Sequence, residues 1–342
     1  MNDKNIGIFE ASVLFINLIC NKFFLFAPEY FRIASQGGIV PMIVVMFIFM
    51  FAVWFFYSKI NFKSKSFGKI SASILVVIYI FSLALTIRQY TETVKIISLT
   101  NSSLYFIEAI FIIAMLFGAL SGFKSIFKAH VIFVPAIFIT TSILTLCASK
   151  NLDFYLLTPL LGNGIRNILT QAFFLISTFL EFTLFFLVKP FMKDKKAFFK
   201  AGNLILLISF VIISIITLSY SASFFGDSSV EKYPPVFQII RLINSGTYFQ
   251  RFDSLFLIAF SLSAYLYLGA MLYFISLIFK NAFKIQNTKV IIIPLWFITV
   301  SVSFVNILSN FVTQSLKTAN MFLWILPVLF PLLLAKKGTD TI

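Results

Sequence analysis

Polar residues divide this chain into a succession of long apolar runs, each about as long as a membrane-spanning helix. A helix needs about 20 mainly apolar residues to cross the hydrocarbon core, and the chain contains ten such runs. We place them near residues 8–30, 39–57, 70–95, 102–120, 126–148, 164–188, 200–222, 253–279, 288–307 and 319–335. The pattern therefore predicts an all-α integral membrane protein of about ten transmembrane helices, with residues 1–342 forming a single transmembrane domain.

Two connections between these segments carry signals of their own. The sixth segment is preceded by Gly162-Asn163-Gly164, which is typical of a turn. The loop over residues 223–252 is long, and its apolar residues alternate with Gln238 and Arg241 at helical spacing. We therefore predict a short amphipathic helix, about residues 234–246, lying on the outer surface.

The composition supports a membrane protein and excludes several chemistries. Hydrophobic residues make up 60% of the chain and charged residues 11%, against about 25% charged residues in soluble domains. The two cysteines, Cys20 and Cys147, lie in apolar runs, and His130 is the single histidine. We predict no disulfide framework, no metal site and no cofactor. The chain lacks a glycine-rich phosphate loop and paired carboxylates, so we do not expect an enzyme.

The net charge of +15 comes mainly from lysines in the loops between the apolar segments. With the N-terminus inside, 17 basic residues fall on the cytoplasmic side and nine on the outer side, with Lys22 assigned to neither. This bias follows the positive-inside rule, and an even number of helices places both termini inside. The charge thus indicates a bilayer rather than nucleic acid as the partner.

Ten helices divide into two halves of five, which we place at about 8–148 and 164–335. Many secondary transporters, including those with the LeuT-like 5+5 fold, consist of two inverted repeats with a broken first helix in each half. The first segment is interrupted at Cys20-Asn21-Lys22, and the sixth at Ser177-Thr178 and Glu181. We therefore predict a LeuT-like inverted repeat in which helices 1 and 6 are broken.

Unwound helices expose backbone groups that must face protein or a water-filled cavity. The freed half-helix N-termini attract a carboxylate, and the freed carbonyls attract an ammonium, so a small zwitterion such as an amino acid fits such a site. Asn21, Ser177 and Thr178 can hydrogen-bond to it, and Phe23, Phe24 and Phe179 would wall the cavity. The candidate ligand-binding residues are Cys20, Asn21, Lys22, Phe23, Ser177, Thr178, Phe179 and Glu181.

The two ionisable residues among these candidates each have alternative roles. Lys22 can extend its long stem to the outer interface, supply a fixed positive charge where related transporters bind sodium, or pair with a substrate carboxylate. Glu181 is either a hydrogen-bonded helix residue or the partner of Lys22 or of a ligand ammonium. Glu108 has no partner that the sequence reveals.

Four stretches carry a resemblance to a known family. They are LFINLICNKFFLFAPEYFRIASQGGIVPMI, ISLTNSSLYFIEAIFIIAMLFGALSGFKSIFKAH, TPLLGNGIRNILTQAFFLISTFLEFTLFFLVKP and YPPVFQIIRLINSGTYFQRFDSLFLIAFSLSAY. In order and spacing the chain resembles the B subunit of bacterial spore germinant receptors, the spore germination permeases within the amino acid–polyamine–organocation superfamily. It departs from that family at Asn21 or Lys22, where a glycine is usual, at Lys124, where an acidic residue is usual, and near Phe260, where a tryptophan is usual.

The resemblance implies a germinant-sensing subunit in the spore inner membrane that assembles with a larger A subunit and a lipoprotein C subunit. It also implies that a small nutrient such as an amino acid binds at helices 1 and 6 and triggers germination. The alternatives are a proton- or ion-coupled secondary transporter for amino acids or amines, which would use the same site, and an assembly component that binds no small ligand.

Overall fold

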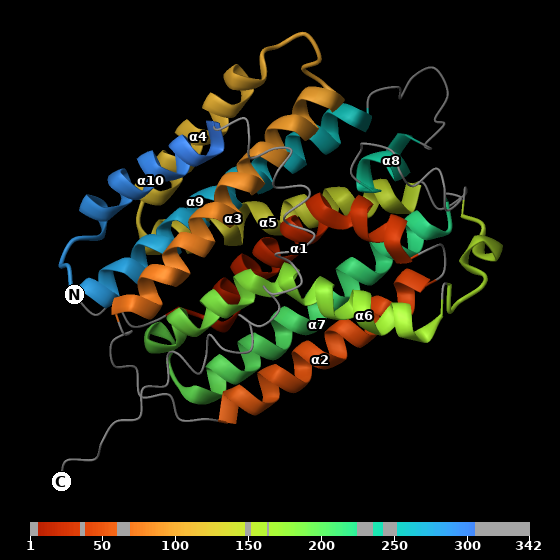
Figure 1. Ribbon diagram of the computed structural model, residues 1–342, viewed down its shortest axis with the longest axis horizontal. Coiled ribbons are helices and arrows are strands. Elements are labelled where there is room, and N and C mark those ends of the chain that lie inside the picture. The colour runs from red at the N-terminus through yellow and green to blue at the C-terminus, as the bar shows by residue number, and fades with distance from the viewer. Residues whose placement is uncertain are drawn as a thin grey trace.

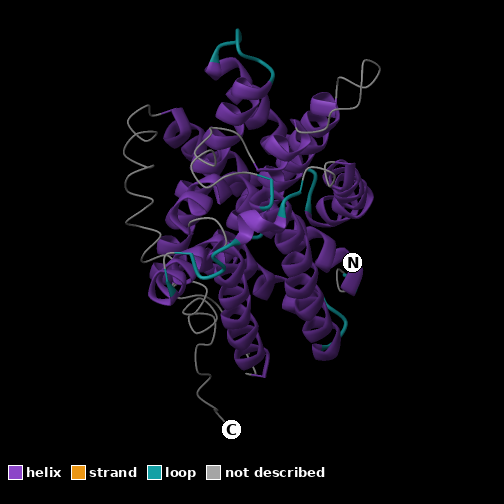
Figure 2. Cartoon of the chain, turned by 90° about the vertical axis from the view of Figure 1, so that its right-hand side faces the viewer, coloured by secondary structure: helices purple, strands orange, loops and turns teal. Residues whose placement is uncertain are grey.

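The computed structural model describes residues 6–34, 38–59, 69–147, 152–162, 164–223, 235–241 and 252–304. Within these ranges the regular structure is helical (Figures 1 and 2). The α-helices are α1 (Ile8–Ala34), α2 (Ile39–Lys59), α3 (Lys69–Ile97), α4 (Leu104–Leu120), α5 (Phe123–Cys147), α6 (Ile165–Leu175), α7 (Lys195–Ser221), α8 (Pro235–Arg241), α9 (Phe252–Phe283) and α10 (Thr288–Phe304). Two 3₁₀ helices, η3 (Phe154–Leu157) and η4 (Ile176–Phe191), complete the described structure.

Nine of the ten predicted segments correspond to these helices, with the sixth formed by α6 and η4 together. The tenth, 319–335, lies outside the described residues. By length and apolar composition, spans within α2, α3, α5, α7 and α9 are each able to cross a membrane, and α4 and α10 are shorter apolar helices. The agreement follows from the length of each apolar run, which is a local property of the sequence.

Local signals fix several helix ends. The Ser103 side chain accepts a hydrogen bond from the backbone N–H of Phe106 at the start of α4, and Asp194 accepts one from Ala197 at the start of α7. These are ordinary N-caps, which satisfy otherwise unpaired backbone donors. Gly162 and Gly164 both have positive φ, which confirms the turn predicted before the sixth segment.

The helices form two groups with α1 between them (Figure 1). On one side α9 packs against α3, α4, α5 and α10, and on the other side α2 packs against α6 and α7. Helix α1 contacts members of both groups, among them α5, α7 and η4. A polar side chain on α1 can therefore reach partners from either group.

Aromatic side chains and glycines set the packing within the groups. Trp54 of α2 lies against Phe185 of η4 and Phe198 of α7, and these two phenylalanine rings stack with centroids 4.6 Å apart. On the other side a Cβ added to Gly269 of α9 would lie 3.0 Å from the Cα of Gly118 in α4. Small residues thus let α4 and α9 approach backbone to backbone, as in many membrane helix pairs.

The helix predicted over residues 234–246 is present as α8, but the prediction that it lies on the outer surface is wrong. Val236 to Ile240 are all at most 4% exposed, whereas Arg241 is exposed. The helix packs against α1, α5, α7 and α9, so both of its faces are covered. Gln238, on the face expected to be polar, accepts a hydrogen bond of 3.1 Å from the Tyr220 hydroxyl.

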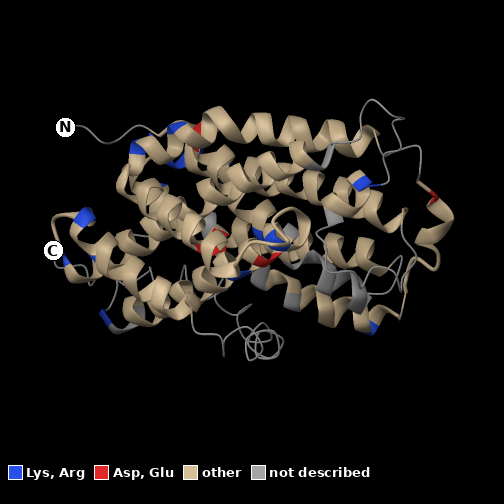
Figure 3. Cartoon of the chain, turned by 90° about the horizontal axis from the view of Figure 1, so that it is seen from above, with Lys and Arg blue, Asp and Glu red and all other residues tan. Residues whose placement is uncertain are grey.

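Most of the basic residues drawn in Figure 3 lie at one end of the bundle. This end holds the start of α5, the end of η4 and the end of α9, where the sequence predicts the cytoplasmic side. At the same end the N–H of Ile6 donates a hydrogen bond of 3.1 Å to the carbonyl of Phe191. The beginning of the chain is therefore joined to the end of η4.

Candidate functional site

The predicted break in the first helix is wrong, because α1 continues without interruption from Ile8 to Ala34. The polar residues expected to unwind it find side-chain partners instead. The Asn21 amide donates to Asn17 Oδ1, one turn earlier, at 2.9 Å, and Lys22 reaches partners on other helices. Since these contacts satisfy the polar groups, the backbone keeps its own helical hydrogen bonds.

The sixth segment does change at the predicted place, although by a change of helix type rather than by unwinding. The α-helix ends at Leu175, and a 3₁₀ helix of 16 residues begins at Ile176, next to Ser177 and Thr178. Runs of 3₁₀ helix longer than three or four residues are uncommon and often mark a hinge or local strain. Glu181 lies within this unusual element.

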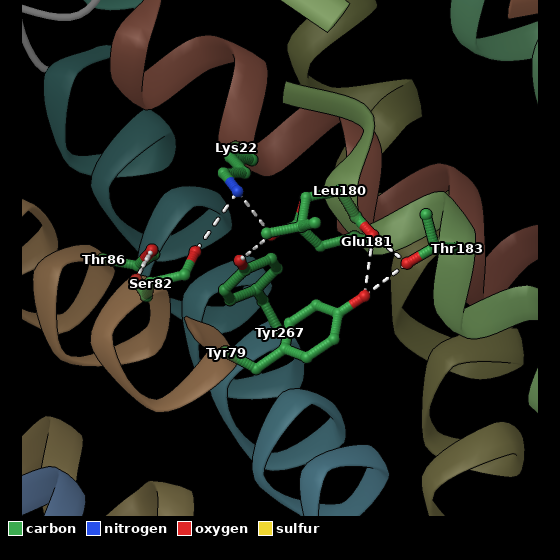
Figure 4. A network of polar contacts seen from close by, with 8 residues as sticks. All are labelled: Lys22, Tyr79, Ser82, Thr86, Leu180, Glu181, Thr183 and Tyr267. Atoms are coloured by element: carbon green, nitrogen blue, oxygen red, sulfur yellow. Dashed lines mark hydrogen bonds and ion pairs between the residues drawn. The ribbon is translucent and has the colours of Figure 1, made fainter. Parts of the chain in front are cut away.

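A buried ion pair joins α1 to η4. The Lys22 ammonium lies 2.8 Å from Glu181 Oε1, and the two side chains are 8% and 0% exposed. Figure 4 shows Lys22 pointing toward Glu181 and toward Ser82 of α3, whose hydroxyl accepts from the ammonium at 3.2 Å. Of the alternatives for Glu181, pairing with Lys22 is confirmed, and the extension of Lys22 to the outer interface is wrong.

The two carboxylate oxygens of Glu181 differ in their hydrogen bonds. Oε1 accepts from Lys22 and also from the Tyr267 hydroxyl of α9, at 3.0 Å (Figure 4). Oε2 is buried and accepts no hydrogen bond from any described group. A carboxylate oxygen without a donor in a buried site is costly, so a further donor at this atom would be stabilised.

A second set of contacts holds the first turns of η4 against α3. The Tyr79 hydroxyl donates to the Leu180 carbonyl at 3.2 Å and lies in close contact with the Thr183 hydroxyl (Figure 4). Tyr79 is fully buried. The position of Glu181 is thus determined by groups on both sides of it along η4.

Next to the ion pair, α1 meets α9 through a compact amide cluster. Asn21 Nδ2 donates to Ser263 Oγ at 2.6 Å, and Ser263 Oγ donates to Asn17 Oδ1 at 2.7 Å. Asn17 Nδ2 is buried without a partner among the described groups. These residues line a cavity of about 40 Å³ together with Cys20 and Phe260, room for a few water molecules and too small for an amino acid.

The structure places the predicted site residues unevenly. Cys20, Asn21, Lys22 and Glu181 come together at one level of the bundle, and Cys20 is a buried free thiol. The side chains of the other four candidates, and that of Phe24, lie outside the described ones; the four are Phe23, Ser177, Thr178 and Phe179.

Sequence reasoning missed four polar contributors: Asn17, Ser82, Ser263 and Tyr267. One signal was available for Asn17, which stands four residues before Asn21 on the same helix face. Nothing in the sequence around Tyr267 and the two serines distinguishes them from other hydroxyl residues in apolar segments.

A second buried carboxylate lies apart from this cluster. Glu108 of α4 is 0% exposed, and its Oε2 lies 3.4 Å from Arg88 Nη1 of α3. Arg88 also pairs with Glu92 at 2.8 Å. Arg88 is thus the partner that the sequence did not reveal for Glu108. Among the described residues no group of three histidines, cysteines or carboxylates is arranged to hold a metal ion.

Comparisons with known proteins agree on family and fold. A family model described as spore germination protein matches residues 36–312. Spore germination protein KB of Bacillus subtilis (strain 168) is 21% identical over 271 residues, which cover 77% of this chain and 72% of that protein.

Two solved transporters share the fold. Mhp1, a nucleobase-cation-symport-1 family transporter in a closed conformation with bromovinylhydantoin bound, superposes with a TM-score of 0.67 at 14% identity, over 95% of this chain and 78% of its own. A Na⁺-coupled sialic acid symporter in a substrate-bound outward-open state gives 0.65 at 12% identity, over 94% and 79%. At such low identity these likenesses show the fold alone, and they confirm the predicted all-α membrane class.

The matched proteins are by name a germination protein and two symporters, in agreement with a non-enzymatic role. The apolar helices and the transporter fold make the chain a multi-pass membrane protein. The division into two inverted repeats stays a prediction. Since the family model spans most of the sequence, the chain belongs to the spore germination protein family.

Proposed function

We propose that this protein is a germinant-receptor subunit in which a small nutrient, an amino acid, binds at the Lys22–Glu181 ion pair and triggers germination. The observation that carries the proposal is the buried pair itself, which links α1 to η4 and leaves Glu181 Oε2 without a donor among the described residues. Ionisable groups at membrane depth are costly and usually functional. Family membership supports the same role.

A zwitterion matches the two charges of this pair. Its carboxylate would take the Lys22 ammonium, and its ammonium would donate to Glu181, including the Oε2 atom that has no partner in the described chain. Each buried charge would keep an opposite charge beside it throughout the exchange, which avoids the penalty of an isolated buried ion. Because both side chains of the pair are buried, an amino acid can reach them only if α1 and η4 separate.

The 3₁₀ geometry of η4 supplies a candidate for the element that changes. A 3₁₀ run of this length is less favourable than an α-helix, so it persists because contacts such as Lys22–Glu181 and Tyr79–Leu180 hold it. A ligand shifts the equilibrium only by binding one state more tightly than the other. Replacing the Lys22–Glu181 contact is a direct way to obtain that difference.

The proposal includes the assembly and place expected for this family. The receptor would lie in the spore inner membrane beside a larger A subunit and a lipoprotein C subunit, which would convert the change at η4 into ion release. The exposed apolar side chains along α4 and α10, such as Phe117 and Phe297, are consistent with contacts to lipid or to such partners.

The test is germination of spores that carry Lys22→Met as the sole copy of the gene. Each of the twenty standard amino acids is supplied singly, and Lys128→Met, an identical change at an exposed lysine of α5, is the matched control. We expect loss or change of the effective amino acid in Lys22→Met with normal membrane levels of the protein, and no change in Lys128→Met. Unaltered responses in Lys22→Met would refute the site assignment.

The fold of the two symporters favours a second candidate, an amino acid or amine transporter that uses the same pair. Uptake of labelled amino acids into proteoliposomes under a proton or sodium gradient separates the two. Accumulation that depends on the gradient and on Lys22 would identify a transporter. A ligand-dependent change in Cys20 labelling without accumulation would identify a receptor.

A further inference from the structure

The basic end of the bundle contains a second and larger cavity, far along η4 from Glu181. It has a volume of about 300 Å³ and lies between the start of α5, the end of η4 and the last turns of α9. This volume reaches the range of roughly 300–1,000 Å³ that is typical of small-molecule sites. It is unrelated to the amide-lined cavity at Asn21 and is not needed by the proposed germinant site.

The walls of this cavity combine charge with an aromatic floor. Lys124 is exposed, Lys280 is half-buried, and the described lining includes no carboxylate. The ring of Phe123 packs against Phe191 and Tyr273, with centroids 4.7 and 5.9 Å apart. The cavity is therefore positive at its rim and apolar at its base.

We propose that this cavity, the Lys124–Lys280 pocket, binds the phosphate group of an anionic ligand, with an anionic phospholipid of the adjacent leaflet as its natural source. Basic pockets between transmembrane helices at the cytoplasmic side are suited to such headgroups. The first turn of α5 adds backbone N–H groups beside Lys124. A diacyl phospholipid also has apolar acyl chains, which are more favourable in contact with the phenylalanine and tyrosine side chains than exposed to water.

The position of the pocket agrees with a lipid ligand. It lies at the end where most of the described lysines gather, which is where a helix bundle meets lipid headgroups (Figure 3). Leu277 extends the apolar wall toward the membrane-spanning part of α9. A phosphate held between Lys124 and Lys280 would therefore leave its acyl chains directed along α9.

The test uses the purified full chain in a neutral detergent and native mass spectrometry with equal concentrations of phosphatidylglycerol and phosphatidylcholine. Each lysine near an anionic lipid favours binding about fivefold, so two predict a preference of roughly 30-fold for phosphatidylglycerol. We expect Lys124→Ala/Lys280→Ala to lose this preference and Lys124→Arg/Lys280→Arg to keep it. The matched control is Lys193→Ala/Lys196→Ala, which removes two exposed lysines of the same end that do not line the pocket.

Competition then distinguishes the two sources of phosphate. If millimolar inorganic phosphate displaces phosphatidylglycerol, the pocket is a phosphate site that a soluble ligand can also occupy. If only the lipid binds, the acyl chains contribute and the ligand is the phospholipid. Equal binding of both lipids by the wild type overturns the proposal. So does an equal loss of preference in both alanine variants, since that result would indicate diffuse surface charge.

Discussion

Cys20 lies on a different face of α1 from Lys22, beside α5, α8 and α9, and so reports whether loss of the Lys22–Glu181 pair loosens the packing around α1. Its thiol is 1% exposed and lies two residues before Lys22, whereas Cys147 is exposed. In a Cys147→Ser background, reaction with a membrane-permeant maleimide therefore reports the opening of the site around Cys20. Its rate is proportional to the open population when opening is fast and reversible.

The structure sets the expected size of the change. In Lys22→Met the Glu181 carboxylate keeps only the Tyr267 hydroxyl as a hydrogen-bond donor among the described side chains. Breaking a buried ion pair on one side costs about 3–5 kcal/mol. If the open state relieves that cost in full, the labelling rate of Cys20 rises by roughly two to three and a half orders of magnitude.

The double variant Lys22→Met/Glu181→Gln separates an unpaired charge from lost packing. Glutamine retains an oxygen that can accept from Tyr267, and no buried charge remains, so labelling should return to within about tenfold of the parent rate. Lys128→Met is the control for the substitution itself and should leave the rate unchanged. The reasoning is refuted if Lys22→Met labels at the parent rate, or if the double variant labels as fast as the single one.

Three further changes test other contacts. Tyr267→Phe removes a hydrogen bond to a charged oxygen of Glu181, which is typically worth about 1.5–3 kcal/mol. The rate of Cys20 labelling should therefore rise, but less than in Lys22→Met. Labelling at the parent rate would contradict this. Asn21→Ala removes the amide that donates to Ser263 and Asn17, and should raise the labelling rate by about tenfold, whereas Asn203→Ala on α7 should not. Gly202→Ala would place a Cβ against the ring of Trp54. We expect about 1–3 kcal/mol of destabilisation in thermal denaturation, relieved by Trp54→Leu. No relief would show that the clash is not the cause.

The sequence predicts the helices because each apolar run contains its own length signal. The segment predicted at 39–57 is α2, Ile39–Lys59, and the segment predicted at 288–307 is α10, Thr288–Phe304. The prediction for Cys20-Asn21-Lys22 went wrong for the opposite reason. Its partners lie 60 residues away at Ser82, 159 away at Glu181 and 242 away at Ser263. Without knowledge of those partners, a polar residue in an apolar segment is interpreted as an interruption of the helix.

The same limit explains which site residues were found. Lys22 and Glu181 are conspicuous because charge is rare in apolar segments, and two opposite charges in the bilayer are expected to meet. Tyr267 is one of 12 tyrosines, and nothing around it distinguishes it from those that only pack. Burial of α8 was missed because its packing partners, α5, α7 and α9, cover the polar as well as the apolar face.

The two proposed sites are joined through η4, and this connection leads to a prediction of its own. Glu181 lies near the start of η4 and pairs with α1, while Phe191 at its end walls the Lys124–Lys280 pocket and accepts from Ile6. A lipid phosphate held there would stabilise the arrangement in which η4 is docked at both ends. An amino acid that separates α1 from η4 must then act against the bound lipid.

Coupling between two sites is reciprocal. Phosphatidylglycerol should therefore raise the amino acid concentration needed to change Cys20 labelling, and the effective amino acid should weaken phosphatidylglycerol binding by the same factor. In Lys124→Ala/Lys280→Ala both effects should disappear together; the loss of only one of them would show that η4 does not couple the sites.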